Sequence, residues 1–394
     1  MPLANRSEKG SLANKILKQL PLADKTAVWG TLGTIRPLLS FEVEQDVQSF
    51  LDAIAGEAVD YRTITHLLTN RTNRQRQQIA EGFQAFTQQD LLKSLQAAVS
   101  GNLETALVGL LKPAAQYDAH EIKLAMKGYW VAHSSYLPGP DGATLAEIFC
   151  TRTTQQLREI LDFYKHDFKS DLETEVASGP SGCFKDLLLA LIKTSREKYS
   201  GVIDYVLIEE DAKALVNAGA GYIGRTDERK WIKILAQRSP EHLNRVSLFR
   251  GMSSKCSSCI DSSAARKLRD QMPTEGFLSL AVFSLYHKMT GLQIEEAVAK
   301  FFQGNAQVGI LTLVSVLRNT PLYFAIRLRQ AIKGPSACHK TLIRILVSRS
   351  ETDLLSIRAE FRKQYGMSLY SFIRAETQGQ YRDLLLGLCR AEDL

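Results

Sequence analysis

The sequence has few of the features that mark membrane-spanning or secreted proteins. No uninterrupted apolar run reaches the roughly 18 residues that a membrane-spanning helix needs. The N-terminus, MPLANRSEKGSLANK, has no apolar signal-peptide core. With 45% hydrophobic and 23% charged residues, the 394-residue chain has the composition of an ordinary globular protein. We therefore expect a cytoplasmic protein without a membrane span of its own.

Cysteine is scarce, and its spacing argues against a structural metal centre. Only Cys256 and Cys259, of six cysteines, form a CxxC pair, and no second pair or pair of histidines completes a zinc site. Catalytic motifs are missing too: the sequence has no GxSxG, no HExxH and no P-loop, and its seven histidines are scattered. We expect free thiols in a reducing compartment and no enzymatic activity.

The net charge of +7, with a pI near 9.0, favours acidic partners such as nucleic acid or anionic lipid. The basic residues are dispersed, without the dense block or aromatic ladder typical of nucleic-acid binding. We therefore expect no nucleic-acid partner.

The chain repeats itself. An apolar helical turn followed by Arg and then Ser or Thr occurs four times, in ITHLLTNRT, LAEIFCTRT, WIKILAQRS and LIRILVSRS, which contain Arg71, Arg152, Arg238 and Arg349. The Ser or Thr is a natural N-cap for a following helix. A polar turn with Gly then precedes a strongly apolar helix, as in AVSGNLETALVGLL and AETQGQYRDLLLGLC. The apolar residues of these helices recur at helical spacing. The pattern predicts an all-α fold of four repeats with about five helices each.

The uneven spacing of the copies predicts the domain boundaries. They are a tail (1–40), repeat one (41–113), repeat two (114–193, with an insertion near 129–140), a linker (194–204), repeat three (205–317, with an insertion near 247–281) and repeat four (318–394). The second insertion is Ser-rich and lacks the repeat pattern, which is typical of a surface loop.

These repeats resemble the annexins from about Phe41 to Leu394, apart from the two insertions. The resemblance is strongest in TPLYFAIRLRQAIKG and in TLIRILVSRSETDLLSIRAEF, and the segments LADKTAVWGTLGTIRP and LCRAEDL are similar to one vertebrate subfamily. It implies a curved disc of four helical repeats. Its convex face would bind anionic, phosphatidylserine-like phospholipid through calcium.

The resemblance also implies where calcium would bind: a Lys-Gly-x-Gly-Thr-Asp loop, capped by a carboxylate about forty residues later. Repeat one has lost the second Gly and the Thr of its loop, and repeat two has an insertion after Gly128. In repeat three an extra residue, Arg225, disrupts the register. The positions that match the capping carboxylate are Ala98, Gly179, Phe301 and Glu376.

Only repeat four therefore keeps an acidic cap, and no repeat keeps both an intact loop and a cap. The candidates for a weak, vestigial site are Ile332, Gly334, Ser336 and Glu376, and those for a degenerate loop are Gly221, Gly224 and Thr226. The alternative for Glu376 is a carboxylate that stabilises its own helix terminus. We expect calcium binding to be weak or absent.

Other residues have structural alternatives. The resemblance implies that Asp118, Glu121, Glu147, Arg152 and Arg344 belong to a polar cluster, which we expect to be a salt-bridge network. We expect the repeated Arg to be structural, bonding carbonyls at helix ends. The lipid-contact candidates are Trp130, Tyr222, Ile223 and Arg225, with loop packing as the alternative for the first three. We expect the segment SLANKILKQLPL to form a short amphipathic helix, and the resemblance implies that it either packs on the core or recruits a protein partner.

Two functions stay open at this point. The first is annexin-type peripheral binding of anionic phospholipid with weak or absent calcium dependence. The second is a protein-interaction scaffold that has lost the membrane switch. Salt separates them, since binding by charge weakens as ionic strength rises. The sequence does not indicate the oligomeric state.

Overall fold

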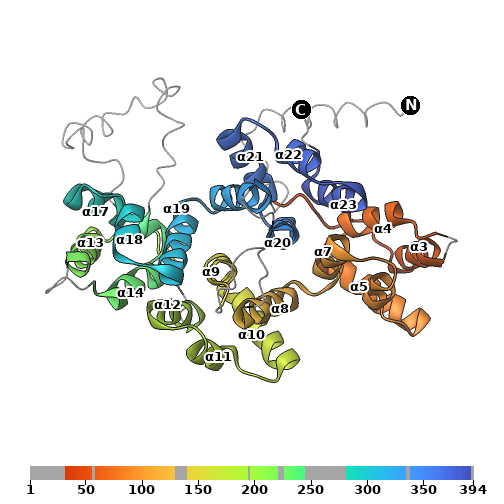
Figure 1. The fold of residues 1–394 in the computed structure, drawn as a ribbon, viewed down its shortest axis with the longest axis horizontal. Helices are drawn as coiled ribbons and strands as arrows, with labels where there is room; N and C mark the ends of the chain where they lie inside the picture. Colours follow the sequence, from red (N-terminus) through yellow and green to blue (C-terminus); the bar gives the residue numbers. More distant parts are fainter. Residues whose placement is uncertain are drawn as a thin grey trace, which may run out of the picture. The chain divides into compact units, whose positions relative to one another are not determined.

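The computed structural model describes residues 32–55, 58–128, 140–193, 196–220, 226–244, 281–333 and 338–391, and the secondary structure within them is helical (Figure 1). The helices fall into two compact units: residues up to Tyr117 together with those from Pro321 onward form one, and Asp118–Thr320 form the other. The predicted all-α class is confirmed. The curved disc implied by the resemblance concerns both units together and stays a prediction.

The first unit begins with five helices in the predicted order. They are α3 (Val43–Ala55), α4 (Tyr61–Thr69), α5 (Asn73–Thr87), α6 (Leu91–Gln96) and α7 (Gly101–Leu111). Phe50, Ile64, Ile79, Leu95 and Leu110 come from these five helices and are almost completely buried. The apolar stripes read from the sequence therefore meet in one core.

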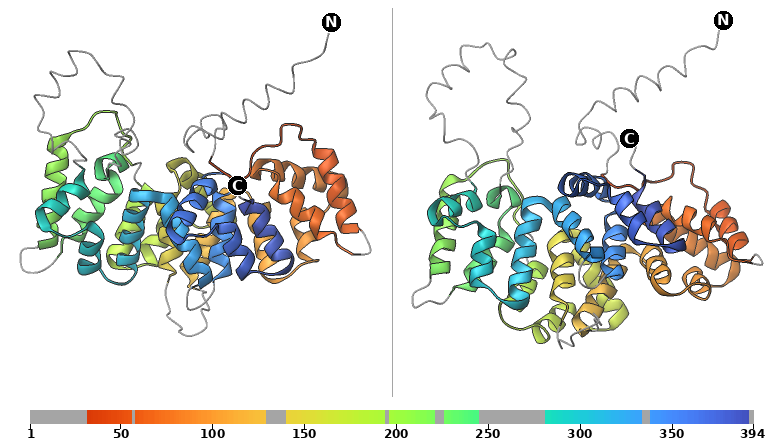
Figure 2. Two further views of the ribbon diagram at one scale, coloured as in Figure 1. Left: turned by 90° about the horizontal axis from the view of Figure 1, so that it is seen from above. Right: turned by 45° about the horizontal axis from the view of Figure 1, so that its top comes forward.

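The same unit contains the C-terminal repeat. Its helices are the second part of α19 (Gly304–Lys333), α20 (His339–Arg349), α21 (Leu354–Tyr365), α22 (Leu369–Glu376) and α23 (Gly379–Cys389). Helix α20 packs against α7, and α23 packs against α4. Repeats one and four therefore share a core although about 210 residues separate α7 from the second part of α19 in the sequence. Figure 2 gives two further views of the ribbon.

The second unit has the same plan. Its helices are α8 (Ala114–Lys127), α9 (Gly142–Thr151), α10 (Thr154–Phe168), α11 (Leu172–Ser178), α12 (Gly182–Lys193), α13 (Tyr205–Ala220), α14 (Glu228–Gln237), α15 (Pro240–Leu243), α17 (Val282–Thr290), α18 (Ile294–Phe301) and the first part of α19. Helix α12 packs on α9 and on α14, and α13 packs on α14 and on α17.

The third helix of repeat three is divided. In repeats one and two the matching helices, α5 and α10, have 15 residues each. In repeat three the four residues of α15 and the nine of α17 occupy this place and contact each other. The predicted insertion near 247–281 falls between them, outside the described residues apart from its last position. The insertion therefore interrupts one helix and leaves its two ends packed together.

Helix α19 is the one helix in the described part of the chain that is long and apolar enough to cross a membrane. Its backbone is not helical at Asn319 (φ −162°, ψ 95°), and Pro321 follows two residues later. Proline cannot donate the helical hydrogen bond and clashes with the preceding turn. Leu313 and Val314 before the break, and Phe324 after it, are buried. Residues 304–333 are thus two shorter helices, each part of a core.

The repeated arginine of each copy joins two helices through a carboxylate. Arg71 binds Asp46 through Nε and Nη2, at 2.6 and 2.8 Å, and Arg152 binds Asp118 at the same distances. Arg238 likewise binds Asp211, with its Nε at 2.6 Å. Planar guanidinium and carboxylate groups match each other at two points. The predicted structural role thus rests mainly on an aspartate of the repeat's first helix, and less on helix-end carbonyls.

Repeat four uses a different partner for its arginine. The position that matches Asp46 is Phe324, whose ring centre lies 4.8 Å from the guanidinium carbon of Arg349. The carboxylate comes from Asp353, with both contacts at 2.7 Å. A guanidinium is favourable over an aromatic face. The loss of the first-helix aspartate is therefore compensated locally.

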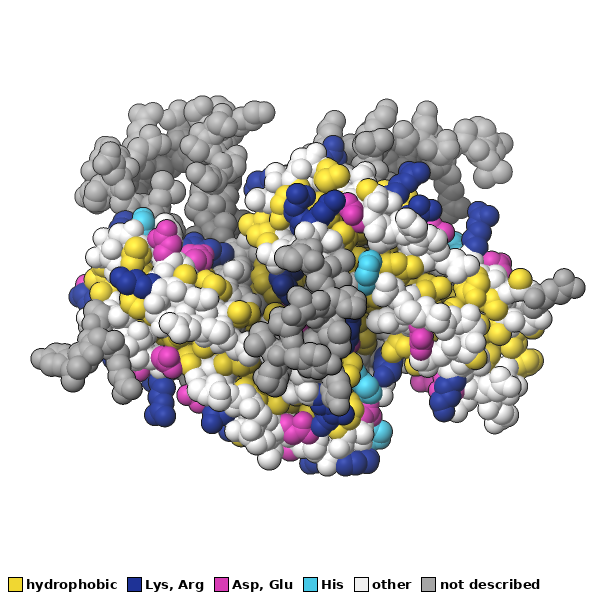
Figure 3. All heavy atoms as spheres, in the orientation of Figure 1, with side chains coloured by type: hydrophobic (Ala, Val, Ile, Leu, Met, Phe, Trp, Pro, Cys, Tyr) yellow, Lys and Arg dark blue, Asp and Glu magenta, His cyan; other side chains and the backbone are white. Residues whose placement is uncertain are grey.

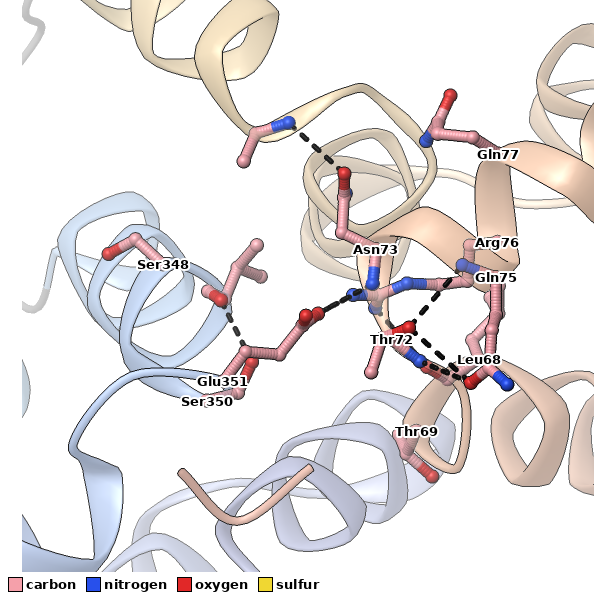
Figure 4. A network of polar contacts seen from close by, with 12 residues as sticks. Leu68, Thr69, Thr72, Asn73, Gln75, Arg76, Gln77, Ser348, Ser350 and Glu351 are labelled. Carbon is pink, nitrogen blue, oxygen red and sulfur yellow. Dashed lines mark hydrogen bonds and ion pairs between the residues drawn. The ribbon is translucent and has the colours of Figure 1, made fainter. Parts of the chain in front are cut away.

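A buried ion pair joins repeats one and four (Figure 4). Arg76 in α5 is 1% exposed, and its Nη2 lies 2.7 Å from Oε1 of Glu351. The same oxygen accepts the backbone N–H of Asn73 at 2.6 Å, and Arg76 Nη1 donates to the carbonyl of Leu68. Burial lowers the pKa of Arg76 to about 10, against the opposing charge of Glu351. The turn between α20 and α21 is thereby tied to the start of α5.

Candidate functional site

The loops between the first and second helices of the repeats are where the sequence placed candidate calcium ligands. One backbone hydrogen bond closes the base of each loop: the N-cap residue of the second helix donates to an alanine carbonyl in the first. The pairs, at 2.7 to 2.9 Å, are Asp60–Ala53, Asp141–Ala125, Asp227–Ala218 and Cys338–Ala331. The loops therefore share one base whatever residues they contain.

This common base gives the loop lengths. The closing bond spans seven positions in repeats one (53 to 60) and four (331 to 338), but sixteen in repeat two (125 to 141) and nine in repeat three (218 to 227). Repeat three therefore has two additional residues, where the sequence suggested one. The loop length inferred from the sequence was wrong because the loop was aligned on its glycines, without knowing which residue ends it. Gly221 and Gly224 themselves lie outside the described residues.

The aspartate that ends three of these loops caps the next helix. Asp60 accepts the backbone N–H groups of Arg62 and Thr63, and Asp141 accepts those of Ala143 and Thr144. The Thr63 hydroxyl bonds the Asp60 carboxylate and holds its pKa below the ordinary value. Asp227 caps α14 by accepting the backbone N–H of Lys230. In repeat four the N-cap is Cys338, whose side chain makes no capping bond. These loops thus keep a folding role that needs no metal.

The second half of a candidate site is the turn before the last helix of each repeat. A glycine with positive φ, between 58° and 68°, marks this turn in all four copies: Gly101, Gly182, Gly304 and Gly379. A left-handed backbone there favours glycine over other residues. The cap positions chosen from the sequence, Ala98, Gly179, Phe301 and Glu376, each lie three residues before that glycine. They therefore occupy one structural position.

Three of these cap positions carry no carboxylate and are packed otherwise. In repeat one the Tyr61 hydroxyl donates to the Ala98 carbonyl at 2.8 Å, joining loop to turn. In repeat two a Cβ on Gly179 would come within 2.9 Å of Met126 Cε, so a larger residue would displace that side chain. Repeat two thus lacks a ligand at this position, and a larger residue there would need Met126 to move.

In repeat three an aromatic ring takes the place of the carboxylate. Phe301 lies against α13 so closely that a Cβ on Gly219 would be 2.7 Å from its ring. Its edge faces the buried Trp231, with ring centres 6.2 Å apart, and Lys300 Nζ lies 5.8 Å from its centre. A cavity of about 590 Å³ beside Phe301 and Gly179 has Glu228 as its one carboxylate. Apolar packing here replaces a ligand position.

Repeat four keeps its acid, and a lysine binds it. Glu376 Oε1 lies 2.6 Å from Nζ of Lys333, the last residue of α19. Their side chains are 28% and 53% exposed, so water reaches both. The pair of Lys333 and Glu376 was not predicted from the sequence. The available signal was the Lys-Gly step at 333–334, which puts a cation at the mouth of the loop.

The remaining predicted residues divide between described and undescribed segments. Ile332 is buried in α19, and Thr226 is half-buried just before the Asp227 cap. Eight of the predicted residues lie outside the described residues: Gly221, Tyr222, Ile223, Gly224, Arg225, Trp130, Gly334 and Ser336. The predictions for those residues, and the domain boundaries, stay predictions.

Comparison with known proteins shows to which family the chain belongs. A family model described as Annexin matches residues 45–110, 117–191 and 323–388. Annexin A9 of Mus musculus is 46% identical over 384 residues, which cover 98% of this chain and 97% of the mouse protein. The chain belongs to the annexin family. The terminal segments LADKTAVWGTLGTIRP and LCRAEDL had suggested one subfamily, annexin nine, and this similarity confirms it.

Solved annexin structures share the fold. The structure of annexin III superposes with a TM-score of 0.76 at 33% identity, covering 92% of this chain and 98% of that one. A calcium-bound annexin (Sm)1 superposes with a TM-score of 0.70 at 22% identity, over 92% and 94% of the two chains. Annexins in general are non-enzymatic phospholipid-binding proteins of the cytosol that associate peripherally with membranes, usually through calcium.

The described residues do not fit a high-affinity calcium site of this annexin type. Calcium takes six to eight oxygen ligands, and carboxylates supply the negative charge that balances it. The four cap positions supply one carboxylate, Glu376, and Lys333 holds it. Within the described segments there is no group of three Asp, Glu, His or Cys residues that could hold a metal ion.

Proposed function

We propose that this annexin binds anionic phospholipid surfaces peripherally, with weak or absent dependence on calcium. The family supports phospholipid binding, and the net charge of +7 supports the preference for anionic lipid. The proposal of weak or absent calcium dependence rests on the residues at the four cap positions. Three lack a carboxylate, and the fourth binds a lysine instead.

The reduced calcium response follows from charge. Backbone carbonyls can approach a calcium ion but do not neutralise it, so a site without a carboxylate leaves two positive charges uncompensated. In repeat four an ion would first have to displace the Lys333 ammonium from Glu376. Once Lys333 is in place, the turn is already neutral. A weak site at Ile332, Gly334, Ser336 and Glu376 is the most that we propose.

Attraction to the membrane then comes from basic and interfacial side chains. Each Lys or Arg close to an anionic leaflet contributes about 1 kcal/mol, and this contribution falls off within a Debye length. We propose Trp130, Tyr222, Ile223 and Arg225 as lipid contacts, because aromatic and long aliphatic side chains anchor at the interface. The protein would be cytoplasmic, without enzymatic activity, and would bind and leave membranes as salt and lipid composition change.

A protein-interaction scaffold is the alternative, and one surface favours it. Tyr199 and Val202, just before α13, and Tyr205 and Val206, at its start, are 45% to 75% exposed. Clustered exposed apolar side chains commonly mark interaction sites. A protein partner at the N-terminal tail belongs to this alternative.

The test is co-sedimentation with phosphatidylserine vesicles, with phosphatidylcholine vesicles as the control. Each is measured with millimolar calcium or chelator, at low and high salt. We expect binding to phosphatidylserine in chelator that is lost at high salt. Binding that needs calcium would refute the calcium claim, and no binding under any condition would favour the scaffold. Glu376→Gln tests whether the residual calcium site contributes. We expect this variant to bind phosphatidylserine vesicles in chelator as the wild type does.

A further inference from the structure

An apolar groove lies between α3 and α5 in the first unit, with a volume of about 430 Å³. Its lining residues are Val43, Glu44, Val47, Gln48 and Leu51 on α3 and Gly82, Ala85 and Phe86 on α5. The three apolar residues on α3 recur every four positions, so the groove follows one side of that helix. Figure 3 shows hydrophobic side chains over these two helices at the right of the view.

Gly82 and Phe86 give the groove its floor and its edge. A Cβ on Gly82 would lie 2.8 Å from Val43 and 3.2 Å from Val47, so the bare glycine lets α3 lie close against α5. One helical turn later Phe86 is 73% exposed, whereas Phe83 on the same helix is buried. An exposed aromatic ring beside an apolar hollow is typical of an interaction site.

The surroundings of the groove are acidic, although the whole chain has a net charge of +7. The sequence has no lysine or arginine between Arg36 and Arg62, or between Arg76 and Lys93. These two stretches contain all of α3 and the part of α5 that borders the groove. The exposed carboxylates on and beside the two helices are Glu42, Glu44, Asp52 and Glu81. The groove therefore has an apolar floor and an anionic rim.

This charge decides which kind of occupant fits. An anionic leaflet would be repelled by the rim, so a phospholipid surface does not suit the groove. A second copy of the chain that presented the same face would bring like charges together. A partner with an apolar stripe and basic residues beside it would gain from both the floor and the rim.

The length of the groove suits an α-helix. Val43 and Leu51 are eight residues apart on α3, which corresponds to about 12 Å along the helix axis. Two anchors at positions i and i+7 of a partner helix are about 10.5 Å apart. A third anchor at i+3 or i+4 falls between them, which is the spacing by which apolar grooves recognise amphipathic helices.

We propose that the groove between α3 and α5 binds an amphipathic α-helix of another protein whose polar face is basic. Its apolar anchors cover Val47, Leu51 and Phe86, and its lysines or arginines face Glu44 and Asp52. The proposal does not rest on lipid binding. Because the rim repels an anionic leaflet, such a partner and the membrane do not compete for this surface.

Fluorescence anisotropy of a labelled peptide, titrated with the full chain in the absence of lipid, tests the proposal. The probe is a peptide of about 18 residues, long enough to form a helix, with leucines at i, i+3, i+4 and i+7 and lysines on the opposite face. One matched peptide has glutamate in place of every lysine, and another has the same composition without the apolar stripe. We expect the first peptide alone to bind, and its binding to weaken as salt rises.

Variants of exposed residues show where the peptide binds. Phe86→Ser should weaken binding about tenfold or more, because the ring is no longer there to be buried by the peptide. Glu44→Lys should weaken it about two- to fivefold, as expected for a surface charge pair. Val206→Ser and Glu210→Lys, at exposed positions of α13, are the matched controls and should leave the affinity unchanged.

Hydrogen exchange of the full chain gives a second readout, in which the basic peptide should slow amide exchange in residues 43–55 and 79–87. Equal binding of the basic and the acidic peptide would overturn the proposal. So would an equal loss of affinity in Phe86→Ser and Val206→Ser, or slowed exchange confined to other helices. No binding of the basic peptide to the folded wild type would also overturn it, because the groove would then not be a site for such a helix.

Discussion

The buried pair of Arg76 and Glu351 gives a prediction whose size can be worked out from the contacts. Removing one partner of a buried ion pair typically costs about 3–5 kcal/mol, because a charge is left without compensation. Here the Glu351 side chain is 31% exposed, so water can replace part of its effect. Arg76 also keeps its bond to the Leu68 carbonyl. We expect Glu351→Ala to cost about 2–3 kcal/mol of unfolding free energy.

The structure also predicts the compensating change. The positions that match Arg76 in the other three repeats are Leu157, Leu243 and Leu354, each of them buried. A leucine therefore fits this place in the fold. Replacing both partners of a buried pair by apolar groups is often close to neutral. In the Glu351→Ala background, Arg76→Leu should recover most of the lost stability.

Urea denaturation followed by far-ultraviolet circular dichroism measures this cycle, using the wild type, both single variants and the double variant. We expect the largest loss for Glu351→Ala alone, because that variant alone leaves a buried guanidinium uncompensated. If the double variant is as unstable as Glu351→Ala, the cost does not come from the buried charge. An unchanged transition midpoint in Glu351→Ala would show that water compensates Arg76 fully.

Three further outcomes are expected. Arg152→Lys should cost about 2 kcal/mol in the same assay, because lysine cannot reproduce the two-point contact with the buried Asp118 carboxylate. Glu376→Gln should change stability by less than about 1 kcal/mol, since this pair is exposed, and should remove any residual calcium response of vesicle binding while leaving binding in chelator unchanged. Burial alone would raise the pKa of Asp211, but hydrogen bonds from His242 and Arg238 outweigh it and hold the pKa below 3.8. The ionised Asp211 therefore stabilises the folded protein above pH 3.8, and this stabilisation is lost as the pH falls through the pKa of Asp211 in the folded state. In Asp211→Asn, the thermal midpoint should lack the decrease with falling pH that Asp211 causes in the wild type.

Local patterns in the sequence were sufficient for the helices. The apolar spacing around Leu384, Leu385 and Leu388 predicted a core face, and all three are buried. The threonine after the repeated arginine was predicted to cap a helix, and Thr72 and Thr153 do so in full capping boxes. Signals of this kind depend on neighbours three or four residues away, which a single sequence displays.

Contacts between distant residues were harder to predict. The Arg76–Glu351 pair joins positions 275 residues apart, and no spacing rule links them. Lys333 and Glu376 lie at the ends of α19 and α22, 43 residues apart in the same repeat, so the acid looked available for a metal. The partner of Arg349 also changed, from a first-helix aspartate to Asp353 over Phe324. Each miss involves a partner that only the packed helices bring close.

The closing bonds explain how annexin loops can lose ligands while the repeats keep their fold. Each loop is held by a backbone hydrogen bond at its base, and three are ended by an aspartate that caps the next helix. Neither interaction uses the oxygen atoms that a calcium ion would need between these points. Nine extra positions in repeat two leave the base unchanged at 2.9 Å. These two interactions therefore depend on the ends of the loop and not on the residues between them, so the fold of the repeat does not require calcium ligands there.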